Sequence, residues 1–369
     1  KVVFFFFLTL EFSNDFSLFE ESIISSFPFA KDRLRNLVTF LREFNPFAVA
    51  PFRSAKEFLL QTLADPLLVD MILCPLMFYG SSHENDMDLS QFAIMFQAIY
   101  LEGMFRPSGT IKDFLSTLLS HYENLGGSYR LRCPVQKIVC EGKSAHRVIL
   151  DEEEIECDAI ISTIGHHETL ALLGETTPES SSGQPRLAFL ENIYRLPSNK
   201  LPPGNENNTI IFFNQAKQFA YRNPDQGVDL RSGVICFPSH FSGLAKTDYT
   251  EIRTTHLTSY QYWKHLSADR NRYLDTKQLY CHSSLLNAEE IIGGFSSHIV
   301  YDNTFTPVTI ERYTAKIGGA IYGSPDKIKN GDIGLNNLFL AGTDQGFLGI
   351  IGSMLSGVSI TNQHILPRL

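Results

Sequence analysis

The spacing of apolar residues changes along the chain and separates it into regions. From Ser13 to about Arg106, apolar residues recur at helical spacing, which predicts a mostly helical layer. The predicted helix starts in this region are Ser54, Asp65 and either Asp88 or Ser90. Ahead of it, residues 2–11 are rich in Val, Phe and Thr, which predicts a strand.

Strand-length apolar segments dominate the middle of the chain. The first group of predicted strands covers residues 129–131, 135–140, 148–150 and 159–163. The Ser-, Pro- and Gly-rich residues 174–186 predict a loop, after which residues 189–196, 209–214 and 233–238 predict an antiparallel sheet. Helices are predicted from Asp248 or Thr250 through Trp263 and over residues 269–292. The acidic residues 151–156 lie between two strands and predict a solvated hairpin tip.

Residues 338–357, called here the terminal motif, combine three elements. Leu338 to Ala341 predicts a buried strand, Gly342 to Gly349 a loop with three glycines and Asp344, and the apolar residues that follow predict a helix. Such a loop lets a ligand approach bare N–H groups at the positive end of the helix dipole, which favours negative charge such as that of a reduced flavin. A glycine-rich turn that only closes an α/β sheet is the alternative.

Composition limits the classes of function. A chain of 369 residues with 43% apolar residues can bury a large core and form two intertwined domains. The net charge of −9 without a basic cluster argues against a nucleic-acid partner. The six cysteines show no CxxC pair and no metal spacing with His, which predicts free thiols in a reducing compartment. His166 and His167 would point to opposite faces of an extended segment, so we predict no metal site.

Several expected signals are absent from the sequence. The apolar run of residues 2–10 is too short to cross a bilayer, and no cleavage site of a signal peptide follows it. We therefore expect an intracellular protein, cytoplasmic or peripheral to a membrane, and not a secreted one. GxSxG and HExxH are missing, so hydrolase chemistry has no support. GxGxxG, the loop that cradles a dinucleotide pyrophosphate, is missing as well.

The terminal motif resembles the C-terminal flavin-binding segment of the phytoene desaturase family, within the amine oxidase superfamily of FAD enzymes. The likeness rests on the order strand, Ala-Gly, acid, glycines and Ser-Gly in one helix. It implies FAD as the cofactor, with Asp344 on the ribityl chain and the N–H groups around Gly349, Ile350 and Ile351 facing the pyrimidine edge of the ring. The same segment contributes Gly342, Thr343 and Gly352 to the expected cofactor site.

Three further segments resemble the same family. Residues 103–110, followed by a helix up to Gly126-Gly127, are similar to its RPxGG-type element, although Thr110 replaces the second glycine; this likeness brings Arg106 into the expected site. Val135 begins a segment similar to the strand that meets the adenine, and Thr163 ends one similar to the strand beneath the cofactor. In residues 306–323, Gly318 to Gly323 either pass close to the flavin ring or form a plain turn.

The expected fold is therefore α/β with mixed α+β character. An FAD/NAD(P)-binding-type α/β layer would come from residues 103–175 and 331–369, incomplete at the N-terminus because GxGxxG is missing. A substrate domain would combine the helical part, residues 1–102, with the sheet and helices of residues 186–330. The chain would then be a fragment or a degenerate copy of the family's full pattern.

The resemblance implies an FAD-dependent oxidoreductase of the desaturase, saturase or isomerase type, acting on C–C bonds of an apolar isoprenoid or polyene. The chain has 29 Phe and 14 Tyr, enough to line a cavity, although a stripe such as Phe92, Phe96 and Tyr100 also fits plain core. One alternative is an amine oxidase, for which Tyr313 and Tyr322 are candidate aromatic residues. Another is a non-catalytic fragment or degenerate paralogue without FAD. No catalytic acid or base stands out; peripheral membrane contact is allowed, and oligomeric state stays open.

Overall fold

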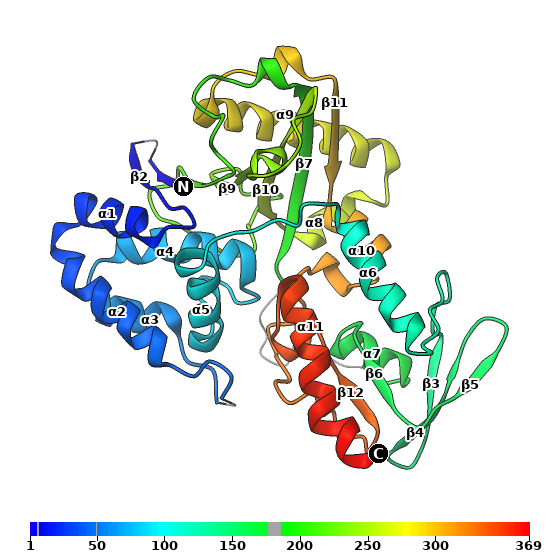
Figure 1. Cartoon of the computed structure of the whole chain (residues 1–369). Helices are drawn as coiled ribbons and strands as arrows, with labels where there is room; N and C mark the ends of the chain where they lie inside the picture. Colours follow the sequence, from blue (N-terminus) through cyan, green and yellow to red (C-terminus); the bar gives the residue numbers. More distant parts are fainter. Residues whose placement is uncertain (6, 49, 176–185) are drawn as a thin grey trace.

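The computed structural model describes residues 1–5, 7–48, 50–175 and 186–369. It shows a helical lobe, a lobe built on a large sheet, and a third lobe that contains the terminal motif (Figure 1). The predicted mixed α/β class is confirmed. The division into domains stays a prediction, and most of the predicted 174–186 loop lies outside the described residues.

The helical lobe is built as the apolar spacing predicts. Its elements are α1 (Phe16–Ser26), η1 (Pro28–Ala30), α2 (Lys31–Glu43), α3 (Ala55–Leu63), α4 (Pro66–Gly80), α5 (Leu89–Phe96) and η2 (Gln97–Leu101). The side chain of Ser54 accepts the N–H of Glu57, and that of Asp65 accepts the N–H of Leu68. Asp88 caps α5 in the same way, so the predicted helix starts are confirmed.

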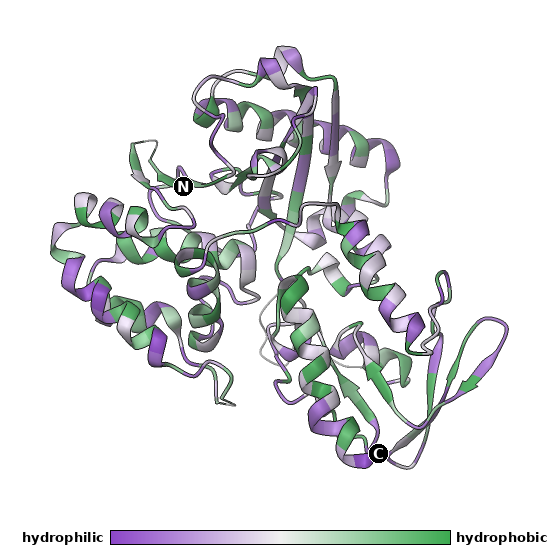
Figure 2. Cartoon of the chain, viewed as in Figure 1, coloured by the Kyte–Doolittle hydropathy of each residue, from purple (hydrophilic) through white to green (hydrophobic). Residues whose placement is uncertain are grey.

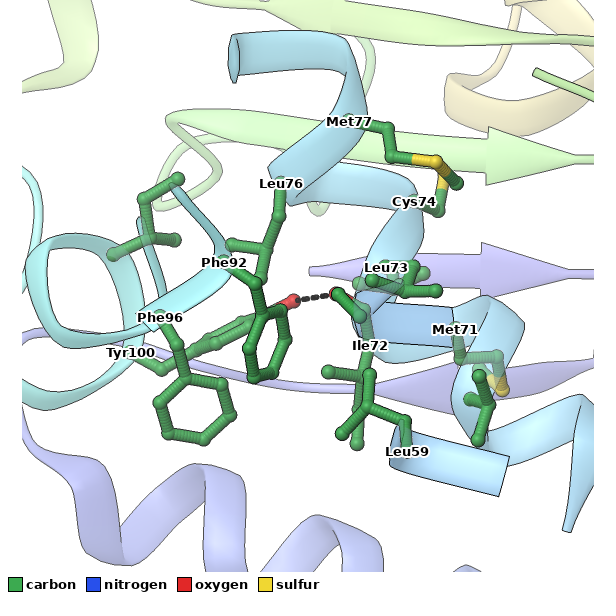
Figure 3. Packing of buried hydrophobic residues seen from close by; sticks show 14 of the residues in the cluster. Leu59, Met71, Ile72, Leu73, Cys74, Leu76, Met77, Phe92, Phe96 and Tyr100 are labelled. Carbon is green, nitrogen blue, oxygen red and sulfur yellow. Dashed lines mark hydrogen bonds between the residues drawn. The ribbon is translucent and has the colours of Figure 1, made fainter. Parts of the chain in front are cut away.

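The aromatic stripe of α5 and η2 lies inside this lobe. Phe92, Phe96 and Tyr100, whose rings lie close together in Figure 3, are fully buried. The Tyr100 ring stacks on Phe19 with centroids 4.1 Å apart. The Tyr100 hydroxyl donates a hydrogen bond of 3.0 Å to the carbonyl oxygen of Ile72. The stripe therefore forms core and does not line a cavity.

The large sheet has the strand order β11-β7-β10-β9-β8-β1-β2. Its strands are β1 (Val2–Phe4), β2 (Leu8–Leu10), β7 (Ala188–Pro197), β8 (Ile210–Asn214), β9 (Ser232–Cys236), β10 (Tyr249–Thr258) and β11 (Tyr301–Phe305). Neighbours are antiparallel except β1 and β8, so the predicted antiparallel sheet is confirmed. The same lobe contains α8 (Tyr260–Leu266), α9 (Arg270–Ile292) and α10 (Pro307–Thr314), with η3 (Ser198–Lys200), η4 (Pro238–His240), η5 (Ser296–His298) and η6 (Ile317–Gly319).

Two predictions in this lobe are wrong. The helix predicted from residue 248 or 250 through Trp263 is mainly the strand β10, with only α8 helical. Thr250, Ile252, Thr254 and His256 are buried and alternate with less buried residues, a period of two that suits a strand between β7 and β9. Residues 2–11 form the hairpin β1–β2 rather than one strand, because the chain reverses from Phe5, whose φ is +54°.

The third lobe holds a second and a third sheet. Its elements are α6 (Ile111–Asn124), β3 (Lys137–Glu141), β4 (Ser144–Ile149), β5 (Glu154–Glu156), β6 (Ile160–Ser162), α7 (His166–Leu172), β12 (Leu338–Leu340), η7 (Thr343–Gln345), α11 (Gly349–Ile360), η8 (Thr361–Ile365) and η9 (Leu366–Arg368). Strands β3, β4 and β5 are antiparallel, and β12 pairs with β6 in parallel. The acidic side chains of residues 151–156 are exposed, as predicted.

Other details of this lobe differ from the sequence-based expectations. Residues 129–131 are not a strand, and β3 begins two residues later than predicted. His166 and His167 begin the helix α7 instead of an extended segment. Within the described part of the chain, no group of three or more His, Cys, Asp or Glu side chains is placed to hold a metal ion. All six cysteines are free.

The apolar side of α11 is largely uncovered. Ile350, Ile351, Met354, Leu355 and Val358 are exposed, and Figure 2 colours much of the helix as hydrophobic. The predicted helical spacing is confirmed, but most of the apolar residues that define it do not enter a core. Among the described helices, none has both the length and the apolar character needed to span a bilayer.

Candidate functional site

The pairing of β12 with β6 brings the start of the terminal motif against Thr163. The N–H of Ala341 donates a hydrogen bond of 2.9 Å to the carbonyl oxygen of Ser162. At Gly342, where φ is +91°, a Cβ would lie 3.9 Å from the Thr163 carbonyl oxygen. The left-handed backbone at Gly342 favours glycine and turns the chain out of the strand. Two of the predicted site residues therefore lie side by side.

Asp344 is the most constrained side chain of the motif. It is 1% exposed; its Oδ1 accepts the N–H of Ser324 at 2.9 Å and its Oδ2 the N–H of His166 at 2.8 Å. Burial raises the pKa of its carboxyl, but Lys327, Lys316 and the two amides outweigh burial and bring it below its usual value of 3.8. Asp344 is therefore a buried carboxylate that joins three segments, and its contact with a ribityl chain stays a prediction.

Gly323 shows how closely these segments approach one another. A Cβ at this position would lie 1.9 Å from Oδ1 of Asp344, and the φ of +70° also favours glycine. The chain of residues 318–323, which the sequence left between a plain turn and a cofactor contact, thus passes directly against the terminal motif. Whether it also approaches a flavin stays a prediction.

The first turn of α11 leaves its N–H groups available. Leu348 caps the helix without a side-chain acceptor, and within the described chain no acceptor is found for the N–H groups of Gly349, Ile350 and Ile351. Gly349 is exposed and Ile350 is 51% exposed, so a ligand can reach this turn. The Gly342 amide differs, because it donates to Oγ of Ser356 at 2.5 Å.

A buried polar cluster lies next to Asp344 and leaves several atoms without partners. In this cluster, called here the Arg186 cluster, the Arg186 guanidinium lies 3.2 Å from Glu168 with both side chains less than a tenth exposed. A Cβ at Gly165 would lie 2.3 Å from Oε2 of Glu168 and 2.8 Å from Nζ of Lys316. The buried atoms of this region that have no partner among the described residues include Oε2 of Glu168, Nε and Nη2 of Arg186, Nζ of Lys316 and Oγ1 of Thr343. Buried polar atoms normally have partners, so these atoms fit a polar ligand.

A cavity of about 410 Å³ lies between the helical lobe and the terminal motif; it is called here the interlobe cavity. Its apolar wall includes Phe47, Met87, Ile94, Phe347, Leu348 and Leu355. The charged or titratable residues of its wall are His83, Asp88, Lys327 and Lys329. Its volume falls within the range of small-molecule sites, about 300–1,000 Å³.

Two predicted cofactor residues lie apart from this assembly. Arg106 is exposed, and its guanidinium donates to the carbonyl oxygen of Pro238 at the edge of the large-sheet lobe. Val135 is 36% exposed and precedes β3. The cofactor contacts of Arg106 and Val135 stay predictions. The other predicted site residues lie in or directly beside the terminal loop and helix start: Gly342, Thr343, Asp344, Gly349, Ile350, Ile351, Gly352 and Thr163.

Sequence reasoning missed the residues that surround Asp344. Lys316, Lys327, Arg186, Glu168 and His166 come from separate segments, and none of them belongs to a motif of fixed spacing. The only signal in the sequence was the likeness of residues 306–323 to a cofactor-adjacent segment. A single sequence does not report which distant lysine reaches a given carboxylate.

The tyrosines considered for an amine oxidase do not form a pair. Tyr313 is 77% exposed, with the Arg312 guanidinium over its ring. Tyr322 is partly buried, donates to the carbonyl oxygen of Phe78 at 2.5 Å and packs its ring edge-on against Phe189. The two rings therefore contact different surroundings.

The mixed α/β fold matches solved structures of FAD-dependent oxidoreductases. The chain belongs to the flavin-containing amine oxidoreductase family, whose sequence profile matches residues 12–271. Members of this family use FAD. No curated protein matches the chain in sequence.

Solved structures show the same fold at low sequence identity. An oxidoreductase from Methanosarcina mazei is 15% identical with a TM-score of 0.60, over 90% of this chain and 72% of that one. A putrescine oxidase bound to putrescine is 13% identical with a TM-score of 0.53, over 92% of this chain and 76% of that one. Identities this low establish the fold and leave the substrate undetermined.

Proposed function

We propose that the chain holds a flavin at the terminal motif and uses it to remove or rearrange hydrogen at C–C bonds of an apolar isoprenoid or polyene. The observation that supports this proposal most directly is the first turn of α11, with N–H groups that have no acceptor among the described residues, next to a largely apolar cavity of about 410 Å³. The proposal continues the likeness of the terminal motif to phytoene desaturases.

The residues present fit the ring and ribityl end of the cofactor. The N–H groups of Gly349, Ile350 and Ile351 would hold the pyrimidine edge, and the unpartnered Oγ1 of Thr343 lies beside the Asp344 carboxylate for a polyol chain. The sequence contains no GxGxxG for the pyrophosphate, so we expect this chain to hold FAD less tightly than a protein with that loop, yet tightly enough to keep it through gel filtration. When bound, a flavin supplies the redox step by accepting a hydride.

The protein's own residues would position the substrate and exclude water from it. Phe47, Phe347 and Leu348 belong to the wall between the helical lobe and the terminal motif, and they would keep water from the reacting carbon atoms.

Amine oxidation is the alternative that the family description and the likeness to a putrescine oxidase raise. It needs an aromatic pair around the amine, and Tyr313 and Tyr322 do not form one, so we do not favour it.

Purified chain, mixed with excess FAD and freed of unbound cofactor by gel filtration, tests the proposal. We expect flavin absorption to remain with the protein and to bleach anaerobically on addition of an isoprenoid polyene but not of a diamine. Bleaching by the diamine alone would favour the amine oxidase instead. Protein that stays colourless after gel filtration in every buffer overturns the proposal.

Thr343→Val supplies a matched variant. The Oγ1 atom has no partner among the described residues, so its removal should leave the free energy of unfolding within about 0.5 kcal/mol of the wild type. If Oγ1 bonds the ribityl chain, retention of flavin should fall by about tenfold. Flavin retention equal to that of the wild type would remove Thr343 from the site.

A further inference from the structure

The wall of the interlobe cavity has more basic than acidic side chains among the described residues. Four of its wall residues are charged or titratable: His83, Asp88, Lys327 and Lys329. Asp88 is the one acid among the described wall residues, and its side chain already caps α5 by accepting the N–H of Ser90 at 2.9 Å. Two lysines thus lie in a wall that is otherwise mostly apolar.

The positive charge of Lys329 is only partly neutralised by its partners. Its Nζ lies 3.4 Å from Oδ2 of Asp88, and it donates a hydrogen bond of 2.9 Å to the carbonyl oxygen of Ala50. The ammonium has three donors, so a further acceptor can bind without displacing either partner. Its side chain is about a third exposed.

Lys327 lies deeper and among other cations. Its Nζ donates a hydrogen bond of 2.6 Å to the carbonyl oxygen of Tyr322. Burial, together with Lys316 and Arg186, lowers its pKa to about 8, against the opposing effect of Asp344 and Asp326. Burial and the neighbouring cations therefore disfavour the charged form of Lys327, and a bound anion would favour that form.

The rest of the wall suits a flat or extended hydrocarbon. The rings of Phe47 and Phe347 stack with centroids 6.5 Å apart, one from the helical lobe and one from the terminal motif. Leu348 and Leu355 continue the apolar wall along the terminal motif toward α11. An apolar chain placed here would lie beside the helix start at which we propose the flavin ring.

We infer that the interlobe cavity binds an isoprenoid acid, with its carboxylate on Lys327 and Lys329 and its hydrocarbon against the apolar wall of Phe47, Phe347 and Leu348. This inference rests on the proposed function and narrows its substrate class from any apolar polyene to one with an acidic end. The same charges disfavour an amine, because a substrate ammonium would meet two lysines.

Binding of retinoic acid, a twenty-carbon isoprenoid polyene with one carboxylate, is the test. Its affinity for the purified full chain without added flavin is measured by calorimetry and compared with retinol and retinylamine, which share its hydrocarbon. We expect the acid to bind about tenfold or more tighter than the alcohol, and the amine to bind weakest. Equal affinity of the three ligands, or no binding of the acid, overturns the inference.

Lysine variants locate the carboxylate. Lys327→Met and Lys329→Met keep an unbranched side chain that lacks only the terminal ammonium. Each should weaken the binding of retinoic acid about tenfold and leave that of retinol unchanged. Lys112→Met, on the exposed side of α6, is the matched control and should change neither affinity. Circular dichroism shows whether each variant is folded. Folded Lys327 and Lys329 variants that bind the acid like wild type contradict the inference.

The pH dependence gives a second readout. Lys327 is charged below about pH 8 in the free protein, so affinity for the acid should fall as pH rises from 7 to 9.5, and retinol should show no such change. The charged groups around Lys327 are Asp344, Asp326, Lys316 and Arg186, with Asp88, Lys329 and the titratable His83 on the cavity wall. Lys327→Met should remove the fall. Lysine-dependent binding of the acid in protein that never retains flavin would support this inference and overturn the proposed redox function, so the two can fail separately.

Discussion

The N–H of His166 donates a hydrogen bond of 2.8 Å to Oδ2 of Asp344, across 178 residues of sequence. This bond fixes the start of α7 to the terminal motif, and the second oxygen of the same carboxylate holds Ser324. Asp344 therefore organises the loop through the hydrogen bonds of its own carboxylate. The effect of an Asp344 substitution on activity can therefore be interpreted only together with its effect on the free energy of unfolding.

Asp344→Ala should lower the free energy of unfolding by about 2–4 kcal/mol. The substitution leaves the N–H groups of His166 and Ser324 without acceptors, and each unpaired buried group costs about 1–3 kcal/mol. Urea unfolding measures the change. Asp225→Ala, at an exposed carboxylate, is the control and should stay within about 0.5 kcal/mol of wild type. A change at Asp344 no larger than that of the control would falsify this role.

The contribution of the Asp344 carboxylate should depend on pH. Its pKa is lower in the folded protein than the ordinary value of 3.8, so its charge stabilises the fold above that pH, and this stabilisation disappears as pH falls through the folded value. The difference in unfolding free energy between wild type and Asp344→Asn should be largest near pH 7 and shrink below pH 3.8. A difference that is constant from pH 7 to pH 3 would contradict an ionised Asp344.

Arg186→Met should destabilise the protein by about 3–5 kcal/mol, because it leaves the Glu168 carboxylate buried without its guanidinium partner. The exposed pair of Arg130 and Glu153 provides the comparison, since Arg130→Met should cost less than about 1 kcal/mol. Replacing Arg186 and Glu168 together by Met should restore part of the loss. Thermal and urea unfolding of the wild type, the two single variants and the double variant measure these changes in stability. A double variant less stable than Arg186→Met would argue against a paired charge.

The core of the helical lobe gives a graded prediction. Tyr100→Phe removes only the hydroxyl that donates to the Ile72 carbonyl, and it should cost about 1 kcal/mol. Phe19→Ala removes the ring stacked on Tyr100 and leaves a cavity, so it should cost about 3–5 kcal/mol. Both values come from denaturant unfolding, and the reverse order of the two variants would show that the stack contributes little.

Local signals in the sequence predicted the local structure well. Ser54, Asp65 and Asp88 act as helix caps because a side-chain oxygen reaches an N–H only two or three residues away. The terminal motif was predictable for the same reason, since its strand, glycines and helix are consecutive. The strand β10 was missed because its buried positions include Thr254 and His256, whose burial depends on β7 and β9.

The surroundings of the site could not be predicted in this way. Lys327 reaches the interlobe cavity because the preceding residues are held on two sides, with Tyr322 hydrogen-bonded to Phe78 of the helical lobe and Ser324 to Asp344, an arrangement set by distant packing. The Arg186 cluster likewise joins α7, the start of β7 and the segment at Lys316. No periodicity or spacing in a single sequence encodes such encounters.

The parallel pairing of Ile160–Ser162 with Leu338–Leu340 also affects the order of assembly. Between these strands the chain builds most of the large-sheet lobe, so β6 has no partner in this pair until the strands β7 to β11 and then Leu338–Leu340 have been made. Distant parallel strands close slowly, and an open strand edge invites pairing with other chains in the meantime. The lobe that contains the terminal motif therefore closes its parallel pair only after the strands of the large sheet have been made, and its open strand edge is exposed to misassembly in the meantime.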